Sequence, residues 1–302
     1  MDVVVVGSVA LDKVKTPFSD VRESLGGSAS YFSIAASKLC KVGMVAVVGE
    51  DFPPAFTRIF KEADIDLSGL EFLPGGTFTW EGEYDYDLHH RKTISTCLNV
   101  FEGFHPRLPA DYRTVRYVFL ANIAPKLQLE VLNQVSSPRL TVCDTMNFWI
   151  SSEREALAET LQKVDVLVIN DSEVREITGD PSLIRAARKI LKMGPMVVIV
   201  KKGEHGSLLI TRNFYFSAPA YPVEAIVDPT GAGDSFAGGF LGCLARENDL
   251  NERGMRRAVI FGTVMASFAV ESFGVERLRA ASLEEALKRF RELRTISEFE
   301  VE

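Results

Sequence analysis

The chain has 302 residues, 46% of them hydrophobic, with a formal net charge of −7, so it can bury the core of one large α/β domain or two smaller ones. Its acidic balance excludes nucleic acid as the main partner, because binding to a nucleic-acid backbone needs clustered Lys and Arg. No apolar run reaches membrane-spanning length and the four scattered cysteines suggest reduced thiols, so we expect a cytoplasmic protein with no membrane partner.

The N-terminal region predicts a buried strand followed by polar and glycine positions. Val3 to Val6 is a continuous β-branched run, which is typical of a strand buried on both faces of a parallel sheet. Asp12 follows it, where open α/β sheets bind ligands, although an exposed loop carboxylate is the commoner case. Gly26 and Gly27 then lead into a helix and would let a substrate lie against the backbone. Tyr31 in that helix packs either on a substrate or in the core.

A segment from about residue 70 to residue 100 has a different composition. It is rich in Thr, Tyr and Phe, and Trp80, Tyr84 and Tyr86 alternate with acidic residues. This period of two predicts hairpin strands with one polar face. His89, His90 and Arg91 in this segment either reach a substrate or form a solvated strand end.

Beyond this segment, short apolar runs alternate with helical stretches. The runs lie at 115–121, 140–143, 164–169 and 196–200. This alternation implies parallel βαβ connections, so we predict a doubly wound, mostly parallel sheet flanked by helices. Ligands bind at the carboxyl ends of the strands in such sheets, and Asp144 with Asn147 follows one of them.

Asn170 and Glu173 lie one helical turn apart where another strand ends and a helix begins. Their side-chain oxygens could orient the waters of a Mg²⁺ ion. Alternatively, Asn170 caps the helix and Glu173 reaches back to it. The spacing fits both interpretations.

Lys201 and Lys202 end the next strand. Either one approaches a phosphate, or both form an ordinary surface pair. Gly203 and Gly206 follow directly. A later helical stretch around Thr263 is rich in small residues, which would let an adenine ring approach.

The most specific stretch runs from Val227 to Phe236 and reads Val-Asp-Pro-Thr-Gly-Ala-Gly-Asp-Ser-Phe. Gly231 and Gly233 let backbone N–H groups approach a ligand, and the helix that begins at once adds the positive end of its dipole. This predicts a site for a phosphoryl group. Asp234 would repel a bound phosphate, which makes sense if it accepts the proton of a hydroxyl that attacks that phosphate. The plain alternative is an ordinary turn with Asp234 as a helix cap.

Together these motifs resemble the PfkB (ribokinase-like) carbohydrate kinase family, in which they occur in the same order. The turn departs from the family's Asp-Thr-Thr-Gly-Ala-Gly-Asp only by Pro229 in place of the first Thr. The resemblance implies a single ribokinase-like α/β domain over 1–302, with a small β-sheet lid formed by about 12–25 and 70–100. It also implies ATP-dependent transfer of a γ-phosphoryl group to a hydroxyl of a sugar-like molecule, with Mg²⁺ as cofactor.

The resemblance further implies a role for each matching residue. Asp234 would be the catalytic base, with the N–H groups of Gly231, Ala232 and Gly233 on the transferred phosphoryl oxygens. Substrate would contact Asp12, Gly26, Gly27, Tyr31 and Asp234. ATP would contact Asn170, Lys201, Gly203, Gly206, Thr230, Gly231, Gly233 and Thr263. Asn170 and Glu173 would hold Mg²⁺ through water, and Asp228 would bind K⁺ beside the anion site.

Two departures from the family leave the substrate open. Tyr31 stands where relatives carry an Asn that touches the sugar, and Trp149 stands where they carry an Arg. Ribose, fructose, nucleosides, sugar acids and cyclitols all fit. Lid strands in this family often pair between subunits, so a homodimer through the lid is a further expectation.

Two other functions compete with the kinase. One is a non-catalytic relative that binds nucleotide and sugar without turnover, against which the intact Asp234 argues. The other is a dinucleotide-dependent dehydrogenase. It is disfavoured because the first strand is not followed by Gly-x-Gly-x-x-Gly.

Overall fold

The short apolar runs form the strands of one large sheet in this computed structural model, which describes residues 1–88 and 91–298. In spatial order the strands are β13 (Tyr215–Ala218), β12 (Ser207–Thr211), β11 (Val197–Lys201), β10 (Val166–Asn170), β9 (Leu140–Asp144), β8 (Tyr117–Leu120), β1 (Val3–Val6), β4 (Val42–Gly49) and β5 (Asp66–Leu73). Neighbours from β5 to β11 pair in parallel, whereas β12 pairs antiparallel with both β11 and β13. The predicted mostly parallel sheet is confirmed.

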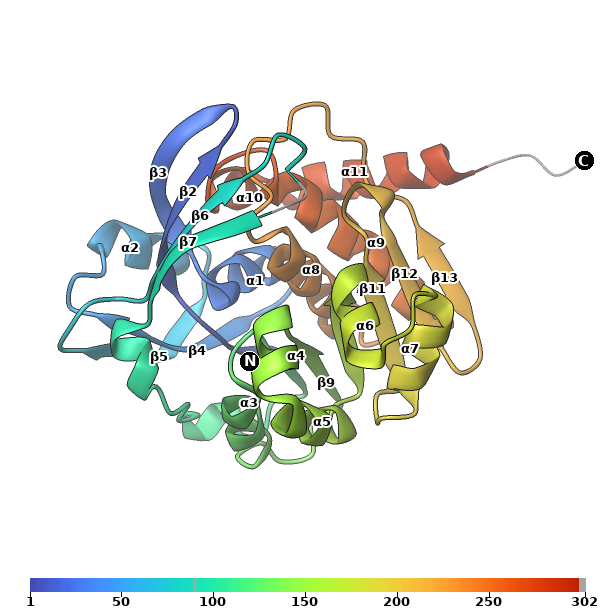
Figure 1. Cartoon of the computed structure of the whole chain (residues 1–302), viewed down its shortest axis with the longest axis horizontal. Helices are drawn as coiled ribbons and strands as arrows, with labels where there is room; N and C mark the ends of the chain where they lie inside the picture. The colour runs from blue at the N-terminus through green and yellow to red at the C-terminus, as the bar shows by residue number, and fades with distance from the viewer. Residues whose placement is uncertain (89–90, 299–302) are drawn as a thin grey trace, which may run out of the picture.

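Helices cover both faces of this sheet (Figure 1). One face carries α1 (Ser28–Ser37), α2 (Pro54–Glu62), α8 (Ala232–Glu247), α9 (Glu252–Ala269), α10 (Glu276–Ala280) and α11 (Leu283–Ser297). The other carries α3 (Pro125–Leu132), α4 (Asn147–Ser152), α5 (Arg154–Lys163), α6 (Asp171–Thr178) and α7 (Leu183–Leu191). Short 3₁₀ turns are η1 (Asn99–Gly103), η2 (Ala110–Tyr112) and η3 (Gly203–His205). Val3 and Val5 point to the first core and Val4 and Val6 to the second, which explains the unbroken apolar run.

Helix α8 packs closely against two other helices because glycines line it. A Cβ placed on Gly238 would lie 2.5 Å from the carbonyl oxygen of Phe32 in α1. One placed on Gly239 would lie 2.6 Å from the carbonyl oxygen of Phe261 in α9. Contacts this close leave α8 little freedom, so its N-terminus is held firmly in place.

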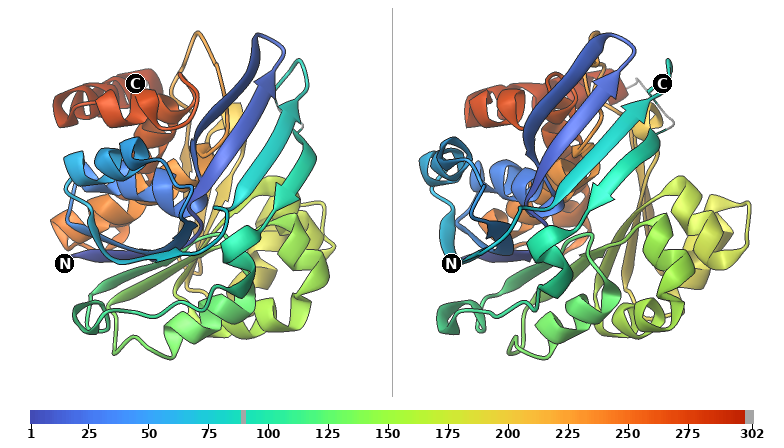
Figure 2. Two further views of the ribbon diagram at one scale, coloured as in Figure 1. Left: turned by 90° about the vertical axis from the view of Figure 1, so that its left-hand side faces the viewer. Right: turned by 60° about the vertical axis from the view of Figure 1, so that its left-hand side comes forward.

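A second, smaller sheet stands off the large one (Figure 2). Its strands, in order, are β3 (Ser19–Gly26), β2 (Ala10–Thr16), β6 (Thr79–Tyr84) and β7 (Arg91–Cys97). β2–β3 and β6–β7 are antiparallel, and β2 and β6 pair in parallel. The hairpin predicted in the aromatic segment is therefore present. The segment begins later than expected, because the chain up to Leu73 belongs to β5 of the large sheet.

One hydrogen-bonded cluster ties the base of the small sheet to the large one. The backbone N–H and hydroxyl of Thr77 donate to Asp51 Oδ1 at 2.7 and 2.6 Å. Gly49, at the end of β4, donates its N–H to Thr77 Oγ1 at 3.0 Å. Asn99 Nδ2 donates to the carbonyl oxygen of Thr77 at 2.8 Å. Both ends of the β6–β7 hairpin therefore meet the carboxyl end of β4.

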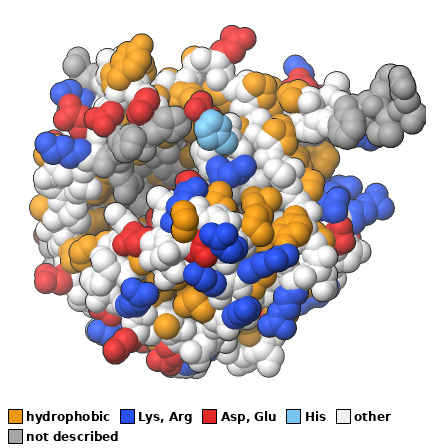
Figure 3. All heavy atoms as spheres, turned by 45° about the vertical axis from the view of Figure 1, so that its right-hand side comes forward, with side chains coloured by type: hydrophobic (Ala, Val, Ile, Leu, Met, Phe, Trp, Pro, Cys, Tyr) orange, Lys and Arg blue, Asp and Glu red, His pale blue; other side chains and the backbone are white. Residues whose placement is uncertain are grey.

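Helix α7 has one buried, apolar side and one exposed, basic side. Its buried side carries Ala186, Ala187 and Ile190, and its exposed side carries basic residues. Lys and Arg side chains gather on this side of the molecule (Figure 3). Arg185 and Lys189 both pair with Asp180, so part of this charge is neutralised locally. None of the described helices combines the length and hydropathy of a membrane span.

Candidate active site

Three neighbouring strands end in polar residues at one edge of the large sheet. Asp144 ends β9, Asn170 ends β10 and Lys201 ends β11, and Asn170 lies directly opposite Lys201. Lys201 Nζ donates to Asp144 Oδ2 at 3.1 Å, with the two side chains only 19% and 5% exposed. Burial disfavours the charged amine, but Asp144, Glu173 and Asp234 raise the pKa of Lys201. The ammonium therefore stays charged.

The predicted anion turn lies beside this cation, at the N-terminus of α8. Gly231 is the N-cap residue, with a φ of +75° that only glycine adopts readily. A Cβ on Gly233 would lie 2.8 Å from Lys201 Nζ. The N–H of Ala232, one of the predicted phosphoryl donors, donates here to the carbonyl oxygen of Pro229 at 3.3 Å. Asp234 follows in the first turn of the helix, as predicted from the sequence.

Tyr31 packs directly against this turn. Its side chain is 1% exposed, and a Cβ on Gly231 would lie 2.3 Å from its ring atoms. Its hydroxyl is buried and has no hydrogen-bond partner within residues 1–88 and 91–298. Burial raises the pKa of Tyr31, and the charges of Asp12, Asp228 and Asp234 add to the rise. The ring is thus a core residue, while its hydroxyl lies among the acidic residues of the site.

Asp12 is a buried strand residue rather than the loop residue expected from the sequence. It lies in β2 and is 4% exposed. A Cβ on Gly26 would lie 1.9 Å from Asp12 Oδ2, so the carboxylate occupies the space that this glycine leaves. Gly27 has a φ of +90°, and a Cβ there would lie 2.5 Å from the carbonyl oxygen of Ser8. Both glycines therefore make room for parts of the chain itself.

Asn170 and Glu173 form a complete capping box. Asn170 Oδ1 accepts the N–H of Glu173 at 2.8 Å, and Glu173 Oε2 accepts the N–H of Asn170 at 3.0 Å. The capping interpretation is confirmed. In the described part of the chain, no three His, Cys, Asp or Glu side chains are grouped to hold a metal ion. A Mg²⁺ ion at this edge would therefore depend mainly on water and phosphate ligands.

Asp228 and Thr230 form the start of the anion turn. Asp228 is fully buried, its Oδ1 accepts the N–H of Thr230 at 2.9 Å, and its Oδ2 has no hydrogen-bond partner in the described ranges. Burial raises the pKa of Asp228, although Thr230 and the backbone of Gly274 oppose the rise. Thr230 Oγ1 shares a 3.1 Å hydrogen bond with the hydroxyl of Tyr84 from the small sheet.

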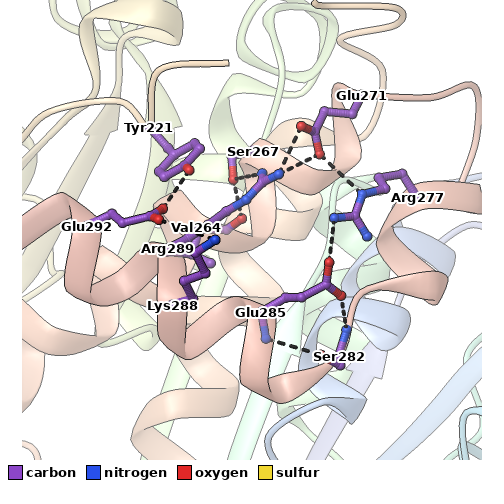
Figure 4. Close-up of polar contacts among 10 residues, drawn as sticks. All are labelled: Tyr221, Val264, Ser267, Glu271, Arg277, Ser282, Glu285, Lys288, Arg289 and Glu292. Atoms are coloured by element: carbon purple, nitrogen blue, oxygen red, sulfur yellow. Dashed lines mark hydrogen bonds and ion pairs between the residues drawn. The ribbon is translucent and has the colours of Figure 1, made fainter. Parts of the chain in front are cut away.

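Polar contacts join α11 to the end of α9 and to the residues that follow it (Figure 4). Arg289 donates to both carboxylate oxygens of Glu271 at 2.9 Å and to Ser267 Oγ at 2.8 Å. Val270 lies directly before Glu271, and its carbonyl oxygen accepts the N–H groups of Val227 and Asp228 at 2.8 and 3.3 Å. Sequence patterns gave no signal for this support, because the charge spacing of α11 looks like that of any solvated helix.

The remaining predicted ATP contacts lie in α9 and in the turn after β11. The hydroxyl of Thr263 donates to the carbonyl oxygen of Val259 within α9 at 3.1 Å. Gly203 and Gly206 have positive φ values of +56° and +76°, which explains both glycines as turn residues. Trp149 Nε1 donates to Asn122 Oδ1 at 3.1 Å. His89 and His90 lie outside the described residues, as does the side chain of Arg91.

Comparisons with known proteins cover nearly the whole chain. The pfkB family of carbohydrate kinases matches residues 2–280. A cytidine kinase of Thermococcus kodakarensis is 32% identical over 257 residues, which cover 83% of this chain and 91% of the relative. The crystal structure of the Methanocaldococcus jannaschii nucleoside kinase superposes with a TM-score of 0.79 at 22% identity, covering 97% of this chain and 99% of that one.

A second solved structure is that of the Burkholderia thailandensis nucleoside kinase in complex with inosine. Its TM-score is 0.79 at 18% identity, over 96% of this chain and 97% of that one. At these identities the two structures establish a shared fold, the ribokinase fold. The predicted fold class is therefore confirmed.

Proposed function

Because the chain belongs to the pfkB family of carbohydrate kinases, phosphotransferases with an alcohol group as acceptor, we propose that it transfers the γ-phosphoryl group of ATP to the CH₂OH group of a nucleoside. The 32% identity to a cytidine kinase supports a nucleoside over a free sugar. The observation that carries the transfer itself is the position of Asp234. It lies in the first turn of α8, close enough to Lys201 and Tyr31 to raise the pKa of each.

In this proposal Asp234 accepts the proton of the attacking hydroxyl. The N–H groups of Gly231, Ala232 and Gly233 hold the transferred phosphoryl oxygens, that of Ala232 after leaving its 3.3 Å bond to Pro229. The charged Lys201, which lies against Gly233, offsets the negative charge that builds up there. Asp12 and the Tyr31 hydroxyl bind hydroxyl groups of the acceptor.

Oxygen-bearing side chains at the sheet edge suit Mg²⁺, which prefers hard oxygen ligands. Asn170 and Glu173 would hold the ion through water, and the ion would neutralise charge on the phosphates. Asp228 would bind K⁺, since its Oδ2 is a buried carboxylate oxygen with no partner among the residues described.

The small sheet would act as a lid over the acceptor, keeping out water that competes with the acceptor hydroxyl. β7 is one of its edge strands, and residues 92 to 98 are all exposed, with the apolar Ile94 and Leu98 among them. An exposed edge strand of this kind pairs readily with another strand. This supports a homodimer through the lid.

The test is ADP release from Mg-ATP in the presence of cytidine, other nucleosides, ribose, deoxyribose, fructose, sugar acids and cyclitols. We expect release that depends on a nucleoside and falls by about three orders of magnitude or more in Asp234→Asn, the scale of losing a central catalytic group. Release with free sugars alone would refute the nucleoside. ATP binding without release for any acceptor would indicate the non-catalytic relative.

A further inference from the structure

Tyr84 of the small sheet reaches the anion turn, which lies 146 residues away in the sequence. Its hydroxyl shares a 3.1 Å hydrogen bond with Thr230 Oγ1. The two side chains are only 8% and 9% exposed, so this bond is shielded from water. It joins the sheet that covers the acceptor to the turn that receives the phosphoryl group.

Apolar side chains from separate segments hold the Tyr84 ring in this position. Val14 comes from β2, Phe273 from the loop after α9, and Val227 from the chain just before the turn. Trp80 from the same strand as Tyr84 and Leu88 from the turn after that strand complete the group. The ring therefore packs in one small core shared by the lid and the turn. Lifting the lid would therefore expose this core and, at the same time, break the hydrogen bond between Tyr84 and Thr230.

Thr230 is the residue of the turn through which such a contact can act. Its N–H donates to the buried Asp228, and the next residue, Gly231, packs on Tyr31. The backbone of the turn is thus fixed on two sides by the main body of the protein. The Thr230 hydroxyl is the group on which the lid acts, because it bonds to Tyr84.

We propose that Tyr84 is a positioning residue that acts through Thr230, so that seating of the lid over the acceptor also orders the phosphoryl-binding turn. The proposal rests on the proposed kinase function. It explains how the kinase would transfer the phosphoryl group to its acceptor rather than to water. Until the acceptor is in place and the lid is seated, the turn lacks one of its supports, and ATP is cleaved slowly.

The experiment is a double-mutant cycle with Tyr84→Phe and Thr230→Val, which each remove one hydroxyl and keep the side-chain shape. We expect each single variant to lower kcat by about threefold to tenfold, the scale of one hydrogen bond between neutral groups. The acceptor KM should change by less than about twofold on the same scale. The double variant should be no slower than Thr230→Val alone, since both changes remove the same bond. Thr230→Ser keeps the hydroxyl and should lose less kcat than Thr230→Val.

Two results would overturn the proposal. Losses in kcat that multiply in the double variant would mean that the two hydroxyls act independently. A Tyr84→Phe variant with a raised acceptor KM and an unchanged kcat would make Tyr84 a direct acceptor contact.

Hydrogen exchange separates failure of the proposal from failure of the proposed function, because it needs no acceptor. Thr230→Val should speed exchange of the β6 amides, and Tyr84→Phe should speed exchange of the amides between Val227 and Ala232. If the unaltered chain phosphorylates no acceptor but this reciprocal effect is present, the kinase function fails and the coupling stands. Absence of the reciprocal effect would refute the coupling.

Discussion

Lys201 and Asp144 form a buried ion pair across two strand ends, with Nζ 3.1 Å from Oδ2, and the ammonium lies against Gly233 at the N-terminus of α8. Each residue of this pair has its own role. Lys201 places a cation beside the proposed phosphoryl position. Asp144 holds that cation in place and charged. Of the two lysines at the end of β11, the structure places Lys201 against Gly233.

We predict that Lys201→Met lowers kcat by at least about a hundredfold, the scale of losing one charge-stabilising donor. It should also destabilise the fold by about 3 kcal/mol, because Asp144 is left buried and unpaired. The double variant with Asp144→Asn should regain most of that stability but not the activity, as measured by urea unfolding and ADP release. Lys202→Met serves as the matched control and should leave both values unchanged. Recovery of activity in the double variant would contradict a direct role for Lys201.

Tyr31→Phe tests the hydroxyl that lies among the acidic residues of the site. The ring and its contact with Gly231 remain, so the melting temperature should stay the same or rise, because a buried hydroxyl without a partner is removed. The acceptor KM should rise by about threefold to tenfold, while the ATP KM stays constant. Tyr112→Phe is the matched control, since that buried hydroxyl donates to the carbonyl oxygen of Asp66 at 3.1 Å. It should lower stability without changing either KM.

The parts of the fold that sequence predicts are those with a local signal. The strand at Val3–Val6 could be predicted because a strand buried on both faces is a continuous apolar run. The helix start at Gly231 could be predicted because the turn needs a positive φ and a close approach. Asp12 was misplaced in a loop, because a buried charge inside a strand contradicts the ordinary pattern of strand residues.

The contacts that complete the site have no such signal. Lys201 and Asp144 are 57 residues apart, and Tyr84 and Thr230 are 146 residues apart. Periodicity states which face a residue occupies, but it does not state which distant residue lies opposite. The Asn170 and Glu173 spacing fits both a cap and a metal site, and the structure shows that the cap is formed.

Asp228→Asn tests the proposed K⁺ site. Burial raises the pKa of Asp228, so the ionised carboxylate costs stability at neutral pH unless a cation compensates it. Asn keeps an oxygen for the N–H of Thr230 and removes the charge. Without K⁺, we expect the variant to be more stable than the unaltered chain by about 1 kcal/mol or more. Added K⁺ should raise the melting temperature and activity of the unaltered chain only; tetramethylammonium is the control cation. An equal response of both proteins to K⁺ would exclude Asp228 from the site.

The cysteines should differ sharply in reactivity. Cys97 is exposed on β7, whereas burial raises the pKa of both Cys40 and Cys243 to about 12 and also raises that of the fully buried Cys143. Because the thiolate is the reactive form, we expect a disulfide reagent at pH 8 to modify Cys97 quickly and the others slowly. Denaturation should make all four thiols accessible to the reagent. Cys97→Ser should remove the fast phase; a fast phase that survives would mean that a second thiol opens readily to solvent.

Arg289→Lys tests the support that α11 gives to the anion turn. The guanidinium lies 3.9 Å from the ring centre of Phe268 and 4.6 Å from that of Tyr221, and it bonds to both oxygens of Glu271. Lysine keeps the charge but cannot hold Glu271 and Ser267 with two separate nitrogens or stack as a plane. We expect a loss of about 1 to 3 kcal/mol in the free energy of unfolding, measured in urea.

The same substitution should also loosen the turn. Glu271 follows Val270, whose carbonyl oxygen accepts the N–H groups of Val227 and Asp228. Hydrogen exchange at these two amides should therefore be faster in Arg289→Lys. Arg294→Lys is the matched control, because Arg294 lies on the same helix in a solvent-exposed pair with Glu298. If exchange at Val227 and Asp228 stays unchanged while stability falls, then α11 stabilises the fold without supporting the turn that leads into α8.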